Sequence, residues 1–351
     1  MLITGLGTAS PPHCYTQAES WRAIQLAPQF EALQPRSRAI LRKVLTGRNG
    51  IVTRHLALDS LEEAFQVDPQ TLHDRFQRHA PALATQAAAR ALKSAGLDPS
   101  DVQALVVSTC TGYLCPGLTS YVIEHLDLPR TALALDLVGQ GCGAALPNLR
   151  VAEALLAGQR ADCVLSVCVE VCSAAFFIDD DPGVLISACL FGDGAGAAVL
   201  QPEPGAGRRI EWKSAESLID PSLRDVLRFE HSHGLLRNVL RPEVPELAAE
   251  HARRVFDAVA GKSGLSKKDV ASWIFHPGGR DVLGALQSRL QLHSQDLRWS
   301  EAVLREHGNL SSPSVFFVLE TALSDSMPSG PAWMSSFGAG FSCHGALLEI
   351  G

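Results

Sequence analysis

The chain has 351 residues, of which 46% are hydrophobic and 19% are charged, and its formal net charge is -7 at pH 7. This length exceeds one small core and suits two domains or one duplicated unit. The acidic balance argues against a general nucleic-acid-binding protein, and no uninterrupted apolar run of about 18 residues predicts a membrane span. Residues 1–7 lack the basic region and apolar core of a signal peptide, so we expect a soluble cytoplasmic protein.

The nine cysteines form no Cys-x-x-Cys pair, and several lie inside apolar runs such as residues 163–169. We therefore expect most of them to be buried thiols in a reducing compartment. Cys110 and Cys115 have no clustered histidines or further cysteines at ligand spacing, so no metal site is predicted.

The first hundred or so residues predict strands and helices in alternation. Residues 1–10 are expected to form a strand and residues 18–45 a helical segment. An Ala-rich helix is predicted over residues 81–95, with proline at its first position and Gly96 to end it. Residues 102–109 have the apolar composition of a buried strand.

The next segment repeats this pattern around a cysteine. Residues 133–138 predict a buried strand, residues 144–158 a helix, and residues 163–171 another buried strand. Gly-rich backbone then leads into a strand over residues 192–200. The Pro- and Gly-containing segment 201–209 is the best boundary, so we expect an N-terminal half at 1–205 and a C-terminal half at 206–351.

The C-terminal half has the same order of elements. Helices are predicted over residues 244–260 and 281–292, with a strand at 271–275 between them. A further helix opens after residue 307 and runs to about residue 323, and two strands close the chain over residues 332–350. The two halves therefore resemble an architectural duplication, in which Asn309 begins its helix much as Cys142 begins its own.

A single cysteine lies in a Gly-flanked turn between the strand at 133–138 and the helix that follows it, in Gly141-Cys142-Gly143. Unpaired N–H groups and the helix dipole at such a helix start favour thiolate over thiol. An ordinary thiol is only a few per cent ionised at neutral pH, so a nucleophilic role also requires a base. Taken alone, Cys142 also fits a buried structural cysteine.

Two further polar residues lie at turns in the C-terminal half. His276 follows an apolar strand in His276-Pro277-Gly278-Gly279, and Asn309 precedes the predicted helix in Gly308-Asn309-Leu310-Ser311-Ser312. By themselves they also fit a hydrogen-bonded strand-end histidine and a helix N-cap. Together with Cys142 they form a set that suits acyl transfer, with a nucleophile, a base and an amide donor.

These motifs, together with Leu190-Phe191-Gly192-Asp193-Gly194, occur in the order found in type III polyketide synthases, which the chain resembles from end to end. The resemblance implies a chalcone-synthase-like acyltransferase with the thiolase fold. That fold is an α/β arrangement of five layers, α-β-α-β-α, built from two duplicated mixed-sheet halves. It also implies a homodimer, in which Cys115 reaches toward the partner's cavity.

The resemblance assigns roles to individual residues. Cys142 would carry the acyl group, His276 would activate it, and Asn309 would donate to the reacting carbonyl. An acyl-CoA starter and malonyl-CoA would be the substrates, without a metal or redox cofactor. Repeated decarboxylative condensation and cyclisation would then give a pyrone, a resorcinol or another hydroxylated aromatic.

The resemblance also suggests residues of the substrate cavity and of the CoA site. Phe191 matches a gatekeeper aromatic, and Arg237 takes the place of a second one. Small side chains in the cavity lead to the hypothesis of a roomy apolar tunnel for a fatty acyl starter or a longer polyketide. The predicted cavity residues are Phe191, Cys110, Ala175, Ser311, Arg237 and Cys115. The predicted CoA-binding residues are Arg42, Lys43, Arg48 and Arg54, a cluster that also fits a solvated basic face.

Two alternatives share the fold. A beta-ketoacyl-acyl carrier protein synthase III would use the same three residues for a single condensation in fatty acid synthesis. A non-catalytic acyl-binding partner of the same fold is the other, although such partners usually lose the nucleophile. Glu170 could belong to a dimer interface or support the site, and the sequence does not separate these roles.

Overall fold

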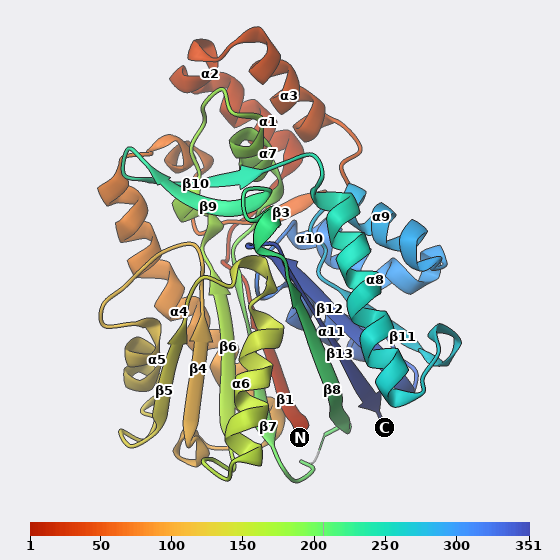
Figure 1. Cartoon of the computed structure of the whole chain (residues 1–351). Helices are drawn as coiled ribbons and strands as arrows, with labels where there is room; N and C mark the ends of the chain where they lie inside the picture. The colour runs from red at the N-terminus through yellow and green to blue at the C-terminus, as the bar shows by residue number, and fades with distance from the viewer. Residues whose placement is uncertain (206) are drawn as a thin grey trace.

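A computed structural model describes residues 1–205 and 207–351 (Figure 1). Its main feature is one mixed sheet of nine strands. In spatial order these are β11 (Ser272–Phe275), β12 (Gly330–Gly338), β13 (Ser342–Ile350), β8 (Ile210–Ile219), β1 (Leu2–Ala9), β7 (Gly194–Gln201), β6 (Val164–Glu170), β4 (Ala104–Ser108) and β5 (Leu133–Leu137).

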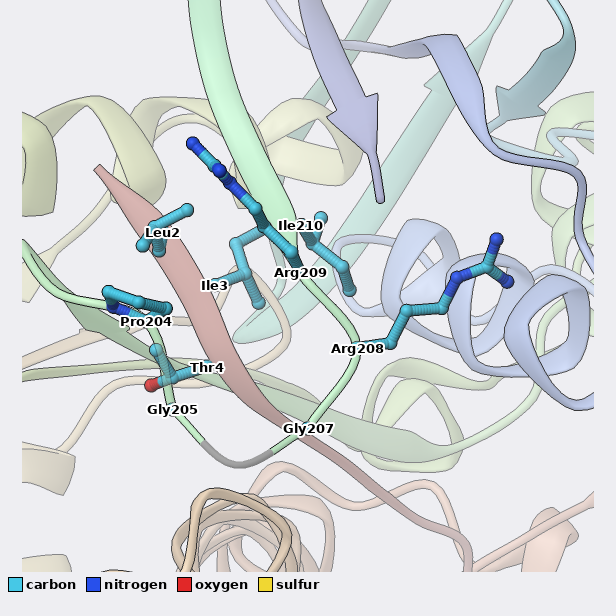
Figure 2. Close-up of a pocket in the computed structure, with 9 residues that line it drawn as sticks. All are labelled: Leu2, Ile3, Thr4, Pro204, Gly205, Gly207, Arg208, Arg209 and Ile210. Carbon is cyan, nitrogen blue, oxygen red and sulfur yellow. The ribbon is translucent and has the colours of Figure 1, made fainter.

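The sheet consists of two halves that are joined by a short contact. β1 and β8 pair only through Leu2 with Glu211 and Ile3 with Ile210. Figure 2 shows this junction, where the side chains of Arg208 and Arg209 point in different directions. Arg208 donates to the carbonyl of Gly351 at 3.0 Å. The predicted boundary falls in this link, beside residue 206, which lies outside the described residues.

Helices form three layers around the two half-sheets. The central helices are α6 (Ala145–Ala157) and α11 (Ser314–Ser324), and each packs against strands of both halves. α4 (Pro69–Ala95) and α5 (Leu118–Leu126) cover the outer face of the N-terminal half-sheet. α8 (Val244–Ser263) covers the outer face of the other, with α9 (Arg280–Leu290) packed beside it (Figure 1). The predicted five-layer fold is confirmed.

A cap of shorter elements lies at one end of the sheets (Figure 1). It contains the small pair β2 (Cys14–Thr16) and β3 (Thr53–His55), and the hairpin of β9 (Leu227–Ser232) and β10 (Leu235–Leu240). Its helices are α1 (Gln17–Leu26), α2 (Pro28–Ala32), α3 (Pro35–Thr46) and α7 (Pro182–Leu190), with α10 (Arg298–His307) nearby. The helical segment predicted over residues 18–45 is thus three helices, because Pro28 and Pro35 each open a new one.

The prediction that Pro81 opens a helix is wrong. α4 begins twelve residues earlier, at Pro69, where the Asp68 side chain accepts a hydrogen bond from the backbone N–H of Thr71 at 2.9 Å. Pro81 lies inside this helix and is buried against the sheet, since the apolar face continues on both sides of it. The expected end at Gly96 is correct, and its φ of 70° is one that glycine adopts without strain.

The strand predicted at residues 133–138 is present as β5, but it is not buried. β5 is the edge strand of the sheet, and Leu133 is 43% exposed while Val138, just beyond it, is 65% exposed. Leu135 and Leu137 are partly buried against the core, whereas the exposed apolar side chains are not covered by the described residues.

The close approach of β1 to α4 generates a stability prediction. A Cβ on Gly7 would lie 2.4 Å from the backbone nitrogen of Ala91 and 2.5 Å from the carbonyl oxygen of Ala87. Gly7→Ala should lower the free energy of unfolding by about 3 kcal/mol, measured by urea denaturation. Gly261→Ala in α8 is the matched control, because an added Cβ there would meet no described atom within 4 Å beyond the neighbouring residues and backbone of its own helix. It should stabilise the protein by about 0.5 kcal/mol; equal effects would contradict the crowding argument.

Candidate active site

Cys142 lies in a short 3₁₀ turn, Gly141–Gly143, which connects the end of β5 to α6. Gly141 has a φ of 56°, in the left-handed region, so the turn needs glycine at this position. The Cys142 side chain is 9% exposed and packs in an apolar cluster with Phe176 and Phe191.

His276 follows β11 and is 1% exposed. Its backbone N–H donates to the carbonyl of Ser335 at 2.9 Å, and its ring meets the edge of Phe337 at a centroid distance of 5.0 Å. The ring nitrogen Nδ1 is buried and has no hydrogen-bond partner among the described residues. Burial lowers the pKa of His276 to about 3, so the imidazole is neutral at physiological pH.

Asn309 is held in a fixed orientation. Its Nδ2 donates to the carbonyl of Gly278 at 3.1 Å, and its Oδ1 accepts from the backbone N–H of Ser311 at 2.8 Å. The backbone also bridges to Phe191. Asn309 does not begin a helix as expected, because α11 starts five residues later, after Pro313.

The three residues from distant parts of the chain face one cavity of about 750 Å³. Cys142 comes from the N-terminal half, and His276 and Asn309 come from the C-terminal half. Phe191 and Phe337 also line this space. The structure thus brings the three side chains to one site, as expected from the sequence.

A polar network lies behind the cysteine. The Ser311 hydroxyl donates to Cys142 Sγ at 3.1 Å. Glu170 is fully buried, and it accepts hydrogen bonds from Ser312 Oγ at 2.6 Å and from Thr111 Oγ1 at 2.9 Å. Burial raises the pKa of Glu170, although these donors act in the opposite direction. Of the two roles that the sequence left open for Glu170, its position in this chain matches support of the site.

Burial raises the pKa of the Cys142 thiol to about 12, while the hydrogen bond from Ser311 lowers it. This net direction is opposite to the one expected from a helix start, because α6 begins only at Ala145 and the thiol is desolvated. The thiol therefore needs a proton acceptor before it can react.

The other predicted cavity residues occupy different places. Cys110 lies beside Glu170, with 3.3 Å between its sulfur and Oε1. Ala175 ends a short 3₁₀ helix and is partly exposed, and Cys115 is exposed. Arg237, on β10, forms an ion pair with Asp181, which does line the cavity. Of the six predicted cavity residues, only Phe191 lines the cavity among the described residues; Cys110, Ala175, Ser311, Arg237 and Cys115 do not.

The predicted CoA-binding residues divide into two groups. Lys43 and Arg48 line the cavity, whereas the exposed Arg42 does not. Arg54 is 3% exposed and donates to the carbonyls of Ala188 and Phe191 at 2.7 and 2.9 Å, so its side chain supports the segment that carries Phe191.

Sequence reasoning missed three basic residues of the cavity wall, Arg36, Arg241 and Arg280. The sequence positions of two of them could have indicated that they belong to the site. Arg36 lies seven residues before Lys43, which places both on one face of α3. Arg280 directly follows the two glycines after His276, at the first position of α9.

The described residues contain neither a metal-binding cluster nor a membrane-spanning helix. Within residues 1–205 and 207–351, no three or more His, Cys, Asp or Glu side chains gather in a metal-binding group. None of the helices in those ranges has the length and apolarity that a membrane crossing requires.

Two duplicated α/β halves in five layers, with cysteine, histidine and asparagine on one cavity between them, define an enzyme of the thiolase-fold class. Family models match almost the whole chain. The model of FAE1/Type III polyketide synthase-like proteins covers residues 12–217, and the C-terminal domain of chalcone and stilbene synthases covers residues 216–348. The chain belongs to the type III polyketide synthases, acyltransferases that condense malonyl-CoA, and the prediction from the motifs is confirmed.

Individual relatives agree with this assignment. The 3,5-dihydroxyphenylacetyl-CoA synthase of Amycolatopsis balhimycina is 30% identical, over 99% of this chain and 92% of its own. The alpha-pyrone synthesis polyketide synthase-like protein of Mycobacterium tuberculosis is 29% identical, over 99% of this chain and 91% of its own. The structure is similar to PKS-I from the brown alga Ectocarpus siliculosus, with a TM-score of 0.91, 27% identity, and coverage of 99% and 98% of the two chains.

The hydrogen bond from Ser311 to the thiol generates a prediction about reactivity. Ser311→Ala removes a donor that favours the thiolate, so the pKa of Cys142 should rise by about one unit. Alkylation of Cys142 by iodoacetamide at pH 8 should then be about tenfold slower, as followed by peptide mass spectrometry. The exposed Cys14 in the same sample is the control and should react at an unchanged rate. An unaltered Cys142 rate would show that Ser311 does not tune the thiol.

Proposed function

We propose that Cys142 carries the growing chain as a thioester, and that His276 and Asn309 support decarboxylation of malonyl-CoA beside it. The observation that carries this proposal is the meeting of the three side chains on one cavity, whose wall also bears the basic residues Lys43 and Arg48. The cavity of about 750 Å³ lies within the range of small-molecule sites.

The first step is acyl transfer to the cysteine. The neutral imidazole of His276 takes the thiol proton of Cys142, and the thiolate attacks the carbonyl carbon of the starter thioester. The carbonyl reforms as the C–S bond to CoA breaks, and the departing CoA thiolate recovers the proton. In this dry site the imidazolium and thiolate stabilise each other, which offsets the desolvation that opposes each charge alone.

The second step is decarboxylation and condensation. Loss of carbon dioxide from malonyl-CoA leaves an enolate, whose oxygen accepts hydrogen bonds from the side chains of His276 and Asn309. Because one N–H of Asn309 is fixed on the carbonyl of Gly278, its second N–H is oriented for this purpose. The enolate carbon then attacks the Cys142 thioester and releases the cysteine, to which the lengthened chain returns for another cycle.

These steps are redox neutral, so the proposal includes no metal or redox cofactor. The CoA phosphates would meet the basic residues at the cavity mouth. We assign this role to Lys43 and Arg48 together with Arg36, Arg241 and Arg280, all of which line the cavity. The guanidinium of Arg54 is committed to backbone carbonyls.

The product class follows from the relatives. Their names describe synthesis of an alpha-pyrone and of 3,5-dihydroxyphenylacetyl-CoA. For this chain we propose iterative extension and cyclisation to a pyrone, a resorcinol or another hydroxylated aromatic. A single condensation in fatty acid synthesis is less well supported, because both family models are of the polyketide class. The cavity would take a fatty acyl starter or a longer polyketide. Ala175, which was predicted to free volume for it, is absent from the cavity lining among the described residues.

We further propose a homodimer in the cytoplasm. β5 presents an exposed apolar edge with unpaired backbone groups, and such edges are normally covered. A second copy of this chain would cover it. The nine free thiols suit a reducing compartment.

The catalytic assignments predict distinct outcomes for three variants. Purified protein would be given malonyl-CoA with acetyl, aromatic and long-chain acyl-CoA starters, and the products would be analysed by mass spectrometry. Cys142→Ala should form no extended product. His276→Gln and Asn309→Ala should each lose about 10²- to 10³-fold in carbon dioxide release from malonyl-CoA. Extended products from Cys142→Ala would refute the thioester role, and one two-carbon extension dependent on acyl carrier protein would favour the fatty acid synthase class.

The dimer proposal predicts a change in mass for an edge variant. Replacing Val138, which is 65% exposed at the end of β5, by lysine should shift the protein from dimer to monomer in light scattering. Leu26→Lys is the matched control, because Leu26 is 85% exposed on α1, which belongs to the cap and not to the edge of the sheet (Figure 1). A dimer mass for both variants would place the interface elsewhere.

A further inference from the structure

The wall of the cavity contains the carboxylate of Asp181 among the basic residues that we assign to the CoA phosphates. Asp181 lines the cavity together with five basic residues, and its side chain is 33% exposed, so solvent screens it only in part. Its place there is fixed because Oδ1 caps α7, accepting from the backbone N–H groups of Gly183 and Val184 at 2.8 and 3.2 Å.

The other carboxylate oxygen of Asp181 is occupied by Arg237, which forms an ion pair with it from β10. Arg237 also contacts Glu230, directly opposite on β9, at 3.4 Å. Glu230 does not depend on Arg237, because Arg228 holds it at 2.6 Å. Loss of Arg237 would therefore leave Asp181 without its ion-pair partner, whereas Glu230 would keep Arg228.

Asp281 is the other acidic residue on the wall, and its situation differs. It pairs with the neighbouring Arg280, at 2.8 Å, and its side chain is 73% exposed. Solvent therefore screens it more strongly than Asp181. Removal of Arg237 would therefore leave an unpaired negative charge, that of Asp181, on the cavity wall.

We propose that Arg237 is a positioning residue for CoA thioesters: it neutralises Asp181, so that the anionic nucleotide of CoA does not meet an unpaired carboxylate on the cavity wall. This inference rests on the proposed entry of CoA through this mouth. It predicts selectivity for the carrier rather than for the acyl group, because the phosphates and not the reacting carbon feel the added charge.

The test compares two malonyl thioesters that differ in phosphate content. Carbon dioxide release would be measured with malonyl-CoA and with malonyl-N-acetylcysteamine, which has the same reacting atoms and no phosphates. In Arg237→Ala, kcat/KM for malonyl-CoA should fall about tenfold through KM, with kcat within twofold of the unmodified protein. With malonyl-N-acetylcysteamine, kcat/KM should change by less than twofold.

A second substitution separates charge from structural support. Asp181→Asn removes the carboxylate and keeps Oδ1 as the cap of α7, so the double variant with Arg237→Ala should recover malonyl-CoA activity to within twofold. Arg228→Ala is the matched control, because it removes ion pairs with Asp225 and Glu230 on the same hairpin and uncovers no carboxylate of the cavity wall. It should behave like the unmodified protein with both thioesters.

The outcomes distinguish this inference from the proposed function. Equal losses with both thioesters and no rescue by Asp181→Asn, or no loss at all, would overturn the role of Arg237. Should Arg237→Ala fail to fold by circular dichroism, Arg237→Gln, which preserves more of the side-chain volume, provides the same comparison. An unmodified protein that released no carbon dioxide from either thioester would instead refute the proposed function.

Discussion

The site depends on one constraint, which is that its cysteine and its histidine are buried where charge is unfavourable. Burial raises the pKa of the Cys142 thiol to about 12 and lowers that of the His276 imidazole to about 3. Both groups are therefore neutral at rest, and a charge on either one alone is disfavoured by desolvation. The donors nearby, Ser311 and the Asn309 amide, are also neutral. Such a site can stabilise an oxyanion without offering a strong acid that would protonate a carbanion.

The fold creates this burial by placing the site between two half-sheets. The central helices α6 and α11 pack on both halves, and the cap of α3, α7 and the β9–β10 hairpin surrounds the mouth of the cavity. The surroundings of Cys142 and the rest of the cavity wall therefore differ in charge. Cys142 packs among apolar side chains, whereas charged side chains such as Lys43, Arg48 and Asp181 line other parts of the same cavity.

Local patterns in the sequence were sufficient to predict the three residues that meet at the site. They were not sufficient to predict the start of α4, the exposure of β5 or the ion pair of Arg237. Cys142, His276 and Asn309 each lie in a turn rich in glycine next to an apolar segment, so both the chemistry and the element were visible in a few residues. Pro81 misled because burial of a long helix face outweighed its usual preference for a first turn. β5 has the composition of a buried strand, but it is the edge strand of the sheet, and Leu133 and the neighbouring Val138 are exposed. The pairing of Arg237 with Asp181 joins residues 56 positions apart, and no local pattern announces such a contact.

The division of the site between the two halves has a consequence for engineering. The N-terminal half supplies Cys142, the C-terminal half supplies His276 and Asn309, and β1 and β8 share only two residue pairs. Separate polypeptides for the two halves would each lack part of the chemistry, and α6 and α11 would each expose an apolar face. Those faces would drive the fragments together, so a split version of this enzyme would be inactive in pieces and would report their reassembly through its product.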